Sequence, residues 1–297
     1  MIKLRVPATS ANMGAGFDTL GVAVGLYNRM MIEEIPEGLE VINKNTQSFI
    51  PQDTSNLIYR AMAELFDYVG YEQKGYRITQ DSQIPMTRGL GSSSACIIGG
   101  MLAANIISGR QLSYQEIIHL AATEGHPDNV GPALFGGFCV SLMDDDKTII
   151  KSTKLKSHIK FAVIIPDFFV ATKKSRGVLP SKIDFKDAVF NVGHASMFQA
   201  AMLTCDMKAL EIGVKDKLHQ QYRKSYVDGM EDIFEKTYHL GSHATYLSGS
   251  GPTILSILDG NYDEFKAGME EYFKTNGLEW KCMILPIDNV GAVVSEI

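Results

Sequence analysis

The stretch that most constrains this chain runs from Pro85 to Ala104 and reads PMTRGLGSSSACIIGGMLAA. Two glycines and the serines Ser92 to Ser94 stand directly before a helical run of small and apolar residues. A glycine-rich turn that leads into a helix leaves several backbone N–H groups unpaired at the positive end of the helix dipole. Such a concavity suits an anion, above all a phosphate group.

Other interpretations compete with phosphate binding. The serines would also cap a helix that binds no ligand, because serine is a favoured N-cap residue. The glycines and alanines would also allow close packing of a buried helix. A membrane span is excluded, because the uncharged run from Gly89 to Gly109 begins with a turn and holds five glycines, four serines and an asparagine. The stretch matches neither the P-loop pattern GxxxxGK[ST] nor the GxGxxG fingerprint.

Composition restricts the class of partner and the compartment. The chain has 297 residues and a formal net charge of −6, and its basic residues form no large cluster. This argues against nucleic acid or an anionic membrane as the main partner. The N-terminal residues MIKLRVPATS lack the apolar run of a secretory signal, and the four cysteines have no metal-ligand spacing. We therefore expect a cytoplasmic protein that binds a small molecule.

The order of strands and helices predicts an α+β protein with two domains. A strand from Lys3 to Val6 is expected to end at Pro7, and Gly70 is expected to stop an amphipathic helix that begins at Leu57. The second half shows a β-α-α-β-α-β pattern, which is typical of an α+β sandwich. A lysine-rich segment, 151–157, separates the halves, so the predicted domains are residues 1–155 and 156–297.

Three further segments are candidates for a site. The loop after Pro7 is either a turn or a binding loop, and the serine-glycine segment 244–253 is either a hairpin turn or a second wall around a polyanion. The segment 124–132, EGHPDNVGP, predicts a rigid polar corner, which favours a site over an elaborate loop. Arg176 and Arg223 form either a clamp for a carboxylate or phosphate group or ordinary surface ion pairs.

Three glycine-rich motifs, PATSANMGAGFD, PMTRGLGSSSA and LSGSGPT, occur in this order. Together they resemble the three motifs of the GHMP kinase superfamily. Within that superfamily, the segments PATSANMGAGFDTLG, EGHPDNVGPALFGG, TKKSRGVLP and DKLHQQYR are similar to those of the homoserine kinases. The similarity extends from Pro7 to Leu255. The substitutions that depart from the family pattern, such as Met13 and Gly131, remove no polar group.

The resemblance implies an ATP-dependent transfer of a phosphoryl group to the hydroxyl of L-homoserine, on the route to threonine, with the help of Mg²⁺. It implies a two-domain GHMP kinase fold and a homodimer. The N-terminal domain would resemble domain 2 of ribosomal protein S5, and the C-terminal domain would be a ferredoxin-like α/β sandwich. Two alternatives use the same scaffold: a kinase for mevalonate or a sugar, or a sensor without catalytic activity.

The resemblance also assigns nucleotide and metal contacts. Asn56 would lie near the adenine, and Ser93 and Glu124 would bind Mg²⁺. The run that would surround the ATP phosphates comprises Pro85, Met86, Thr87, Arg88, Gly89, Leu90, Gly91, Ser92, Ser93, Ser94 and Ala95.

Homoserine contacts are implied in the same way, and the residues concerned are Asn12, Asp18, Asn129, Arg176 and Arg223. An acid suits the ammonium group of an amino acid, and two arginines suit its carboxylate. The catalytic set would be Asn129, Glu124 and Thr172, with Thr172 near the transferred phosphate. Phosphoryl transfer mainly requires alignment and charge neutralisation, so we expect Asn129 to position the hydroxyl rather than remove its proton.

Overall fold

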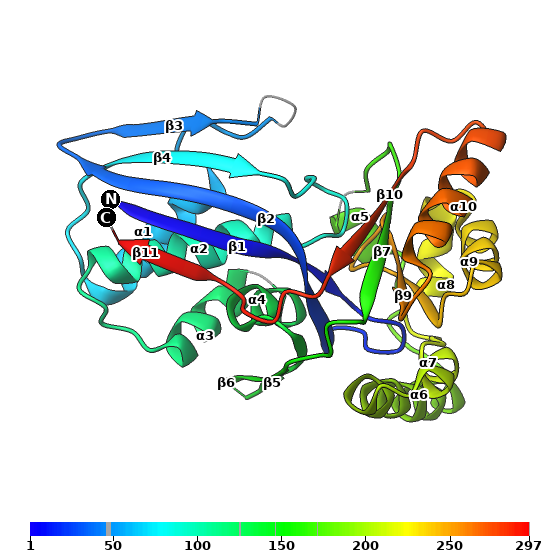
Figure 1. Cartoon of the computed structure of the whole chain (residues 1–297). Coiled ribbons are helices and arrows are strands. Elements are labelled where there is room, and N and C mark those ends of the chain that lie inside the picture. Colours follow the sequence, from blue (N-terminus) through cyan, green and yellow to red (C-terminus); the bar gives the residue numbers. More distant parts are fainter. Residues whose placement is uncertain (46–48, 125, 146, 171, 297) are drawn as a thin grey trace.

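The computed structural model describes residues 1–45, 49–124, 126–145, 147–170 and 172–296. In Figure 1 the chain forms two lobes, each built on one β-sheet with helices packed against it. This arrangement confirms the predicted α+β fold class with two lobes. Within the described residues, no helix is both long enough and apolar enough to cross a bilayer.

The first sheet contains both ends of the described chain. Its order is β11-β1-β2-β4-β3, and β5 and β6 extend it from β2. The strands are β1 Ile2–Ala11, β2 Leu20–Ile35, β3 Leu39–Asn43, β4 Gly75–Ser82, β5 Phe138–Asp144, β6 Lys147–Thr153 and β11 Val293–Glu296. Neighbours run antiparallel except for β3 and β4, which are parallel. The domain division at residues 155 and 156 remains a prediction, and β11 pairs with the first sheet from beyond it.

Four helices cover one face of the first sheet (Figure 1): α1 Leu57–Val69, α2 Ser92–Ile107, α3 Tyr114–Glu124 and α4 Pro127–Phe135. The central helix α2 is buried along most of its length and contacts each of the other three helices as well as β1 and β2. A Cβ atom added to Gly100 would lie 2.4 Å from the carbonyl oxygen of Ile58. The small residues of α2 therefore serve close packing, in addition to any role of its N-terminus.

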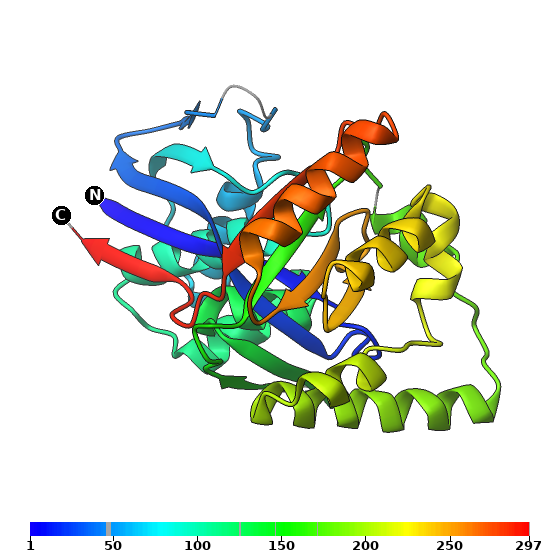
Figure 2. The same cartoon turned by 45° about the vertical axis from the view of Figure 1, so that its right-hand side comes forward.

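The second sheet is antiparallel and has the strand order β10-β7-β9-β8. Its strands are β7 Lys160–Ile165, β8 Ala244–Leu247, β9 Ile254–Leu258 and β10 Lys281–Pro286. Its helical segments are α5 Thr172–Gly177, α6 Phe185–Thr204, α7 Met207–Gly213, α8 Gln220–Arg223, η1 Lys224–Tyr226, α9 Met230–His239 and α10 Tyr262–Thr275. The connectivity is β-α-β-β-α-β, the ferredoxin-like arrangement. Figure 2 shows α9 and α10 on the outer face of this sheet, and α6 running below it.

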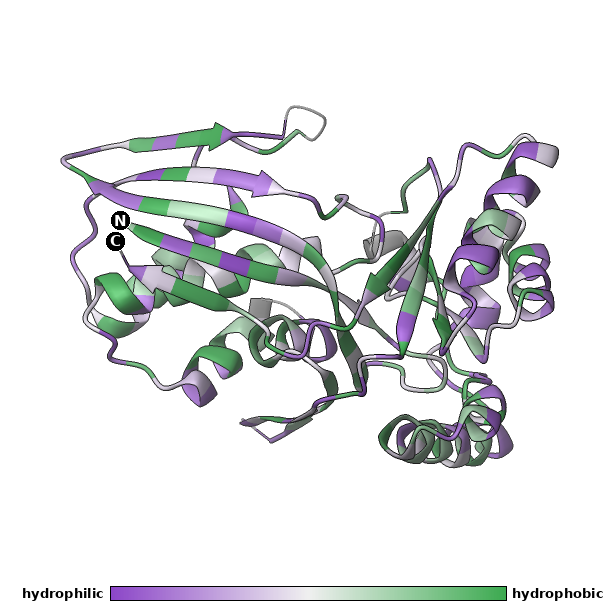
Figure 3. Cartoon of the chain, viewed as in Figure 1, coloured by the Kyte–Doolittle hydropathy of each residue, from purple (hydrophilic) through white to green (hydrophobic). Residues whose placement is uncertain are grey.

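The described residues form two hydrophobic clusters, and the larger one joins the lobes. The larger one fills the first lobe and continues to the inner face of the second sheet, where it includes Phe161 and Tyr246. The smaller one lies between the second sheet and the helices α9 and α10, around Phe265 and Met269. Hydrophobic and hydrophilic residues alternate along the first half of β1 in Figure 3, as expected of a strand with one buried face, whereas its residues from Val6 to Ala11 are all buried. The two lobes therefore share part of one core.

Two local predictions from the sequence are wrong. β1 does not end at Pro7 but continues to Ala11, with a bulge between Pro7 and Ala8. Pro7 is tolerated because the pairing of β1 with β11 stops at Arg5, so its missing N–H faces no strand on that side. The segment 244–253 is not a turn throughout, because its first residues form the buried strand β8.

Candidate active site

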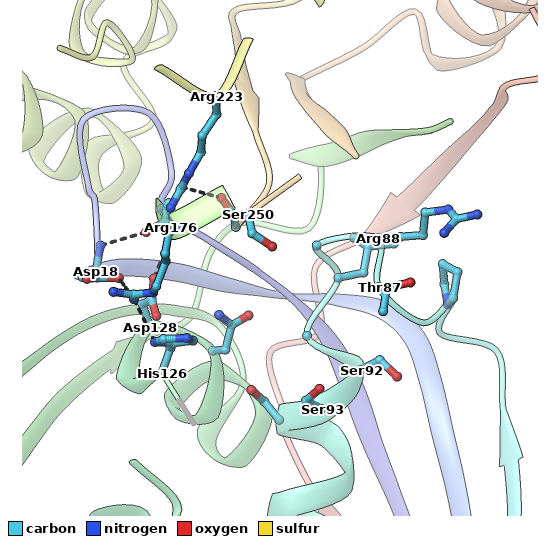
Figure 4. Close-up of a pocket in the computed structure, with 18 residues that line it drawn as sticks. Asp18, Thr87, Arg88, Ser92, Ser93, His126, Asp128, Arg176, Arg223 and Ser250 are labelled. Atoms are coloured by element: carbon cyan, nitrogen blue, oxygen red, sulfur yellow. Dashed lines mark hydrogen bonds and ion pairs between the residues drawn. The ribbon is translucent and has the colours of Figure 1, made fainter. Parts of the chain in front are cut away.

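A cavity of about 300 Å³ lies between the two lobes (Figure 4). Loops from both lobes line it, and so does the N-terminus of α2. Most of the predicted site residues meet here. The lining residues are Asn12, Asp18, Pro85, Thr87, Arg88, Gly89, Leu90, Gly91, Ser92, Ser93, Ser94, His126, Asp128, Asn129, Arg176, Arg223, Gly249 and Ser250.

One wall comes from the run predicted to surround the ATP phosphates, residues 85–95, and we call its part before α2, residues 85–91, the phosphate loop. The N-cap of α2 is Gly91 rather than a serine, so no side chain occupies the first N–H groups of the helix. Gly91 has a φ of +65°, and a Cβ atom there would lie 1.9 Å from Oγ1 of Thr9. At Gly89, with a φ of +75°, a Cβ would lie 2.3 Å from the carbonyl oxygen of Ser248. Only glycine fits these positions, and the exposed N–H groups make the wall suitable for an anion.

The opposite wall carries an acid and two arginines. Nη2 of Arg176 donates to Oδ1 of Asp18 at 2.8 Å and lies 3.0 Å from Nδ1 of His126 (Figure 4). Asp18 has a φ of +50° and is fixed by its own N–H, which donates to Oδ1 of Asn12 at 2.8 Å. The wall thus presents both signs of charge within a few ångströms.

Arg223 is buried, with 2% of its surface exposed, although it faces the same cavity. Its guanidinium donates to the carbonyl oxygen of Gly249 at 2.9 Å and to Nδ1 of His219 at 3.1 Å. His219 in turn donates from Nε2 to the carbonyl oxygen of Gly14 at 2.8 Å, and burial lowers the pKa of His219, so its ring stays neutral. Burial also lowers the pKa of Arg223 to about 10, which leaves it charged at neutral pH.

The polar corner predicted at residues 124–132 is in fact the start of a helix. Pro127 occupies the first position of α4, where its missing N–H costs nothing. Asp128 follows in the first turn of α4, and its Oδ2 accepts a hydrogen bond from the N–H of Asn12 at 3.2 Å. Its Oδ1 is buried without a partner in the described structure, and burial raises the pKa of Asp128 to about 7.

Asn129 lies beside Asp128 at the cavity. Its Oδ1 accepts a hydrogen bond from Oγ1 of Thr9 at 2.8 Å. With the carbonyl end of the amide held in this way, the NH₂ end is the group that remains for a ligand. Asn129 can therefore donate a hydrogen bond to a bound molecule.

Some predicted residues lie elsewhere. Asn56 and Met86 line a second cavity of about 60 Å³, which shares Ser92 and Ser93 with the first. The side chain of Asn56 caps α1 by accepting from the N–H of Ile58 at 3.0 Å.

Four predicted residues remain: Ala95, Arg88, Glu124 and Thr172. Ala95 is buried within α2 and lines neither of them. The guanidinium of Arg88 points away from the serines of α2 (Figure 4). The side chains of Glu124 and Thr172 lie outside the described part of the structure. Among the described residues, no cluster of three acidic, histidine or cysteine side chains could hold a metal ion.

The third glycine-rich motif forms the floor between the two walls. Oγ of Ser248 donates to the carbonyl oxygen of Gly89 at 2.5 Å and lies 2.7 Å from Oγ of Ser10. The turn joins β8 to β9 and also lines the cavity through Gly249 and Ser250, so its place is compatible with the predicted wall around a polyanion.

Sequence reasoning did not place four of the lining residues in its site set: His126, Asp128, Gly249 and Ser250. All four belong to segments that it had marked as candidates. The sequence does not show that these residues face one cavity, because that depends on how the two lobes pack.

Comparison with known proteins identifies the family. The family model for the GHMP kinases N terminal domain matches residues 56–137. A homoserine kinase from Clostridium beijerinckii is 45% identical over 100% of this chain and 99% of its own length. A homoserine kinase from Caldicellulosiruptor saccharolyticus is 44% identical over 100% of this chain and 97% of its own length.

Solved structures agree with the sequence comparison. The crystal structure of homoserine kinase from Cytophaga hutchinsonii superposes with a TM-score of 0.87 and 25% identity, covering 99% of this chain and 97% of the other. A crystal structure of mevalonate kinase superposes with a TM-score of 0.71 at 16% identity, which demonstrates a shared fold only. The identity over the full length of the curated relatives decides the matter: this chain belongs to the homoserine kinase family of the GHMP kinases.

Proposed function

We propose that this chain transfers the terminal phosphoryl group of ATP to the hydroxyl group of L-homoserine and so makes O-phospho-L-homoserine on the route to threonine. One observation carries the proposal: a single cavity joins an anion-binding helix N-terminus to an acid and two arginines. An α-amino acid carries one ammonium and one carboxylate, and this wall complements both. Mevalonate and sugars lack the ammonium group, so Asp18 would have no cationic partner in them.

The phosphate loop fits the triphosphate of ATP. Side chains are excluded at Gly89 and Gly91, so the phosphates can approach the N–H groups of α2 closely. The smaller cavity then suits the adenine, because it shares Ser92 and Ser93 with the larger cavity and is lined by Asn56, Met86 and other residues. These contacts orient the nucleotide with its terminal phosphate toward the larger cavity.

The amino acid enters between charges that already neutralise each other. Asp18 and Arg176 are paired at 2.8 Å, and a zwitterion can replace that pair by giving its ammonium to Asp18 and its carboxylate to Arg176 and Arg223. Its hydroxyl would lie near Asn129, which can donate a hydrogen bond to the hydroxyl oxygen but cannot take its proton. Asn129 thus aligns the attacking oxygen, the main requirement of a loose transition state.

Mg²⁺ would be held by the Ser93 hydroxyl and by Glu124. The Ser93 hydroxyl stands at the first turn of α2, where both cavities meet, and it is a hard oxygen donor of the kind that Mg²⁺ prefers. When bound, the ion would supply charge neutralisation at the phosphates. Thr172 would lie near the transferred phosphoryl group.

The test is ADP release from Mg-ATP by the purified protein, with L-homoserine, mevalonate, galactose or no acceptor in parallel. We expect ADP release that depends on homoserine. If only another acceptor supports turnover, the protein is a kinase but L-homoserine is not its substrate. ATP binding without turnover on any acceptor would support a sensor on the same scaffold instead.

We further propose that the protein acts in the cytoplasm as a homodimer. An exposed apolar side of α6 supports the dimer: Phe185, Val189 and Val192 are 85%, 56% and 69% exposed. Residues 188–205 contain no charged residue. Because each chain has a net charge of −6, an uncharged face is where two copies can meet without mutual repulsion.

A further inference from the structure

We propose that Arg88, although it stands inside the phosphate loop, is a positioning residue for the amino-acid clamp. Arg88 would hold the segment 166–170, which we call the β7 exit segment. Because this segment precedes α5 in the chain, Arg88 would thereby also help to position α5 and its Arg176. The proposal rests on the proposed function, because Arg176 is assigned to the substrate carboxylate there.

The geometry of Arg88 points away from a nucleotide. Its Nε donates to the carbonyl oxygen of Pro166 at 3.2 Å, and its Nη2 donates to that of Asp167 at 2.8 Å. The guanidinium also lies 5.8 Å from the ring centre of Phe169. Figure 4 shows it directed away from Ser92 and Ser93. The planar fork of the guanidinium therefore bridges two successive carbonyls of the second lobe, in a geometry that a single ammonium group does not reproduce.

The two partners of this bridge are not equally held. The phosphate loop has other anchors: the N–H of Thr9 donates to the carbonyl of Leu90 at 3.2 Å, the N–H of Thr253 donates to that of Arg88 at 3.3 Å, and Ser248 binds Gly89. In the part of the chain that the structure describes, the main chain of the β7 exit segment makes no hydrogen bond except the two with Arg88. Phe168 still packs against Trp280 and Val170 is buried, so loss of Arg88 should loosen the main chain of the β7 exit segment without freeing it, and loosen it more than that of the phosphate loop.

The β7 exit segment leads directly to the clamp. α5 begins at Thr172, and its Ser175 is fully buried and donates from Oγ to the carbonyl oxygen of Ser250 at 2.9 Å. Arg176 follows and reaches Asp18. α5 is thus anchored at Ser175, whose carbonyl oxygen also accepts from Nε of Arg223 at 3.3 Å, and Arg88 holds the segment that precedes α5. Loosening this segment should let the Arg176 guanidinium deviate from the position that binds a carboxylate.

The first experiment compares Arg88→Met with Arg88→Lys in steady-state kinetics. A positioning residue predicts that the KM for homoserine rises about threefold to tenfold in both variants, while the KM for ATP changes less than about twofold. If Arg88 were a phosphate ligand, Arg88→Met would raise the KM for ATP, and Arg88→Lys would restore it because it keeps the charge. That second pattern would overturn the proposal.

A double-mutant cycle tests the route through Arg176. Once Arg176→Ala has removed the clamp, adding Arg88→Met should raise the KM for homoserine little further. Independent multiplicative effects would contradict the proposal. Arg110→Met is the control, because Arg110 pairs with Glu296 beyond the opposite end of α2, about 24 Å from the cavity by helix length.

Amide hydrogen exchange separates this proposal from the proposed function. Amides of residues 172–177 should exchange faster in Arg88→Lys and Arg88→Met than in the wild type, while those of α1 stay unchanged. This readout needs no acceptor. Faster exchange in the variants, together with no turnover of homoserine by the wild type, would support the positioning role of Arg88 and reject homoserine as the substrate. Unchanged exchange would reject the positioning role, whichever substrate the protein uses.

Discussion

Arg176 and Arg223 face one cavity, but their surroundings differ. The Arg176 side chain is 41% exposed and pairs with Asp18, whereas Arg223 is buried and its donors are used by carbonyls and by His219. Removing Arg176 should therefore affect binding alone, and removing Arg223 should affect binding and folding together.

For Arg176→Ala we expect the KM for homoserine to rise about tenfold to a hundredfold, the value of one charge-assisted hydrogen bond. Its free energy of unfolding should change by less than about 1 kcal/mol, because exposed ion pairs contribute little. Arg223→Ala should lose about 3 kcal/mol of that free energy, since buried acceptors are left without a partner. Urea unfolding and steady-state kinetics on both variants check this, and an equal loss of stability in the two would contradict it.

Asp128 links the site to pH through burial. Its pKa in the folded protein is raised to about 7, above its ordinary value in an unfolded chain. A carboxyl with a raised folded pKa contributes stability that is fully present below the unfolded pKa and is lost as pH rises through the folded pKa. The relevant window is thus from about pH 4 to about pH 7.

We therefore expect the wild type to lose about 3 kcal/mol of unfolding free energy, relative to Asp128→Asn, between pH 5 and pH 8. The asparagine variant cannot ionise at this position, while other titrating groups are common to both proteins. Urea unfolding of both at the two pH values, without ligand, measures the difference. A constant gap between the two proteins would mean that Asp128 is ionised throughout.

Among single residues, those within the segments that resemble homoserine kinases could be predicted from the sequence to lie together. The family resemblance implied contacts with one substrate for Asn12, Asp18, Asn129, Arg176 and Arg223, and all five line one cavity. The orientation of Arg88 could not be predicted, because it depends on a contact with a residue far along the chain. The support of Arg223 by His219 could not be predicted either, because it depends on the burial of both side chains and on a contact of Arg223 with Gly249. Motifs identify which residues meet, but not which way each one points.

At the scale of elements, the phosphate loop depends on positive φ angles and on space. Gly91 and Gly70 provide a matched pair: their φ values are +65° and +69°, but a Cβ at Gly91 would collide with Thr9, whereas nothing lies within 4 Å of one at Gly70. Gly91 is the N-cap of α2, and Gly70 is the C-cap of α1. An alanine would therefore suffer similar backbone strain at the two positions, but it would collide with a neighbour only at position 91.

We expect Gly70→Ala to lose about 1 to 2 kcal/mol of unfolding free energy and to keep the wild-type KM for ATP. Gly91→Ala should show at least that loss and should also lose most ATP-dependent turnover, because the displaced Thr9 and α2 N-terminus no longer shape the anion site. Nucleotide binding by calorimetry and unfolding by urea check the pair. Normal ATP affinity in Gly91→Ala would argue against phosphate binding at this loop.

Elements with local signals were predicted well. The helix from Leu57 ends where Gly70 takes a left-handed conformation, and the predicted helix after the serines is α2. The polar corner at 124–132 was misjudged because two prolines and two glycines suggest a loop, whereas Pro127 at a helix start is favourable. The strand through Pro7 could not be predicted, because only the sheet decides whether its N–H is needed.

At the scale of the whole molecule, α6 is the element that the monomer explains least. Asn191, Phe198 and Met202 on its inner side are buried, yet its outer side leaves large apolar side chains in solvent. Such a contiguous apolar surface is typical of an interface. In the proposed dimer a second copy would cover this surface, because a two-fold contact needs a self-complementary patch.

The last prediction tests this face. Val192→Glu should convert a wild-type dimer to a monomer in sedimentation velocity, since it places two like charges in the contact, one from each copy. The unfolding free energy of the isolated monomer should be unchanged within about 0.5 kcal/mol, because Val192 is 69% exposed in a single chain. Val290→Glu is the control, since Val290 is 61% exposed but stands next to β11 rather than on α6. If Val192→Glu remains a dimer, or if both variants are monomers, the interface does not lie on α6. If the wild type is itself a monomer, the proposed dimer is wrong.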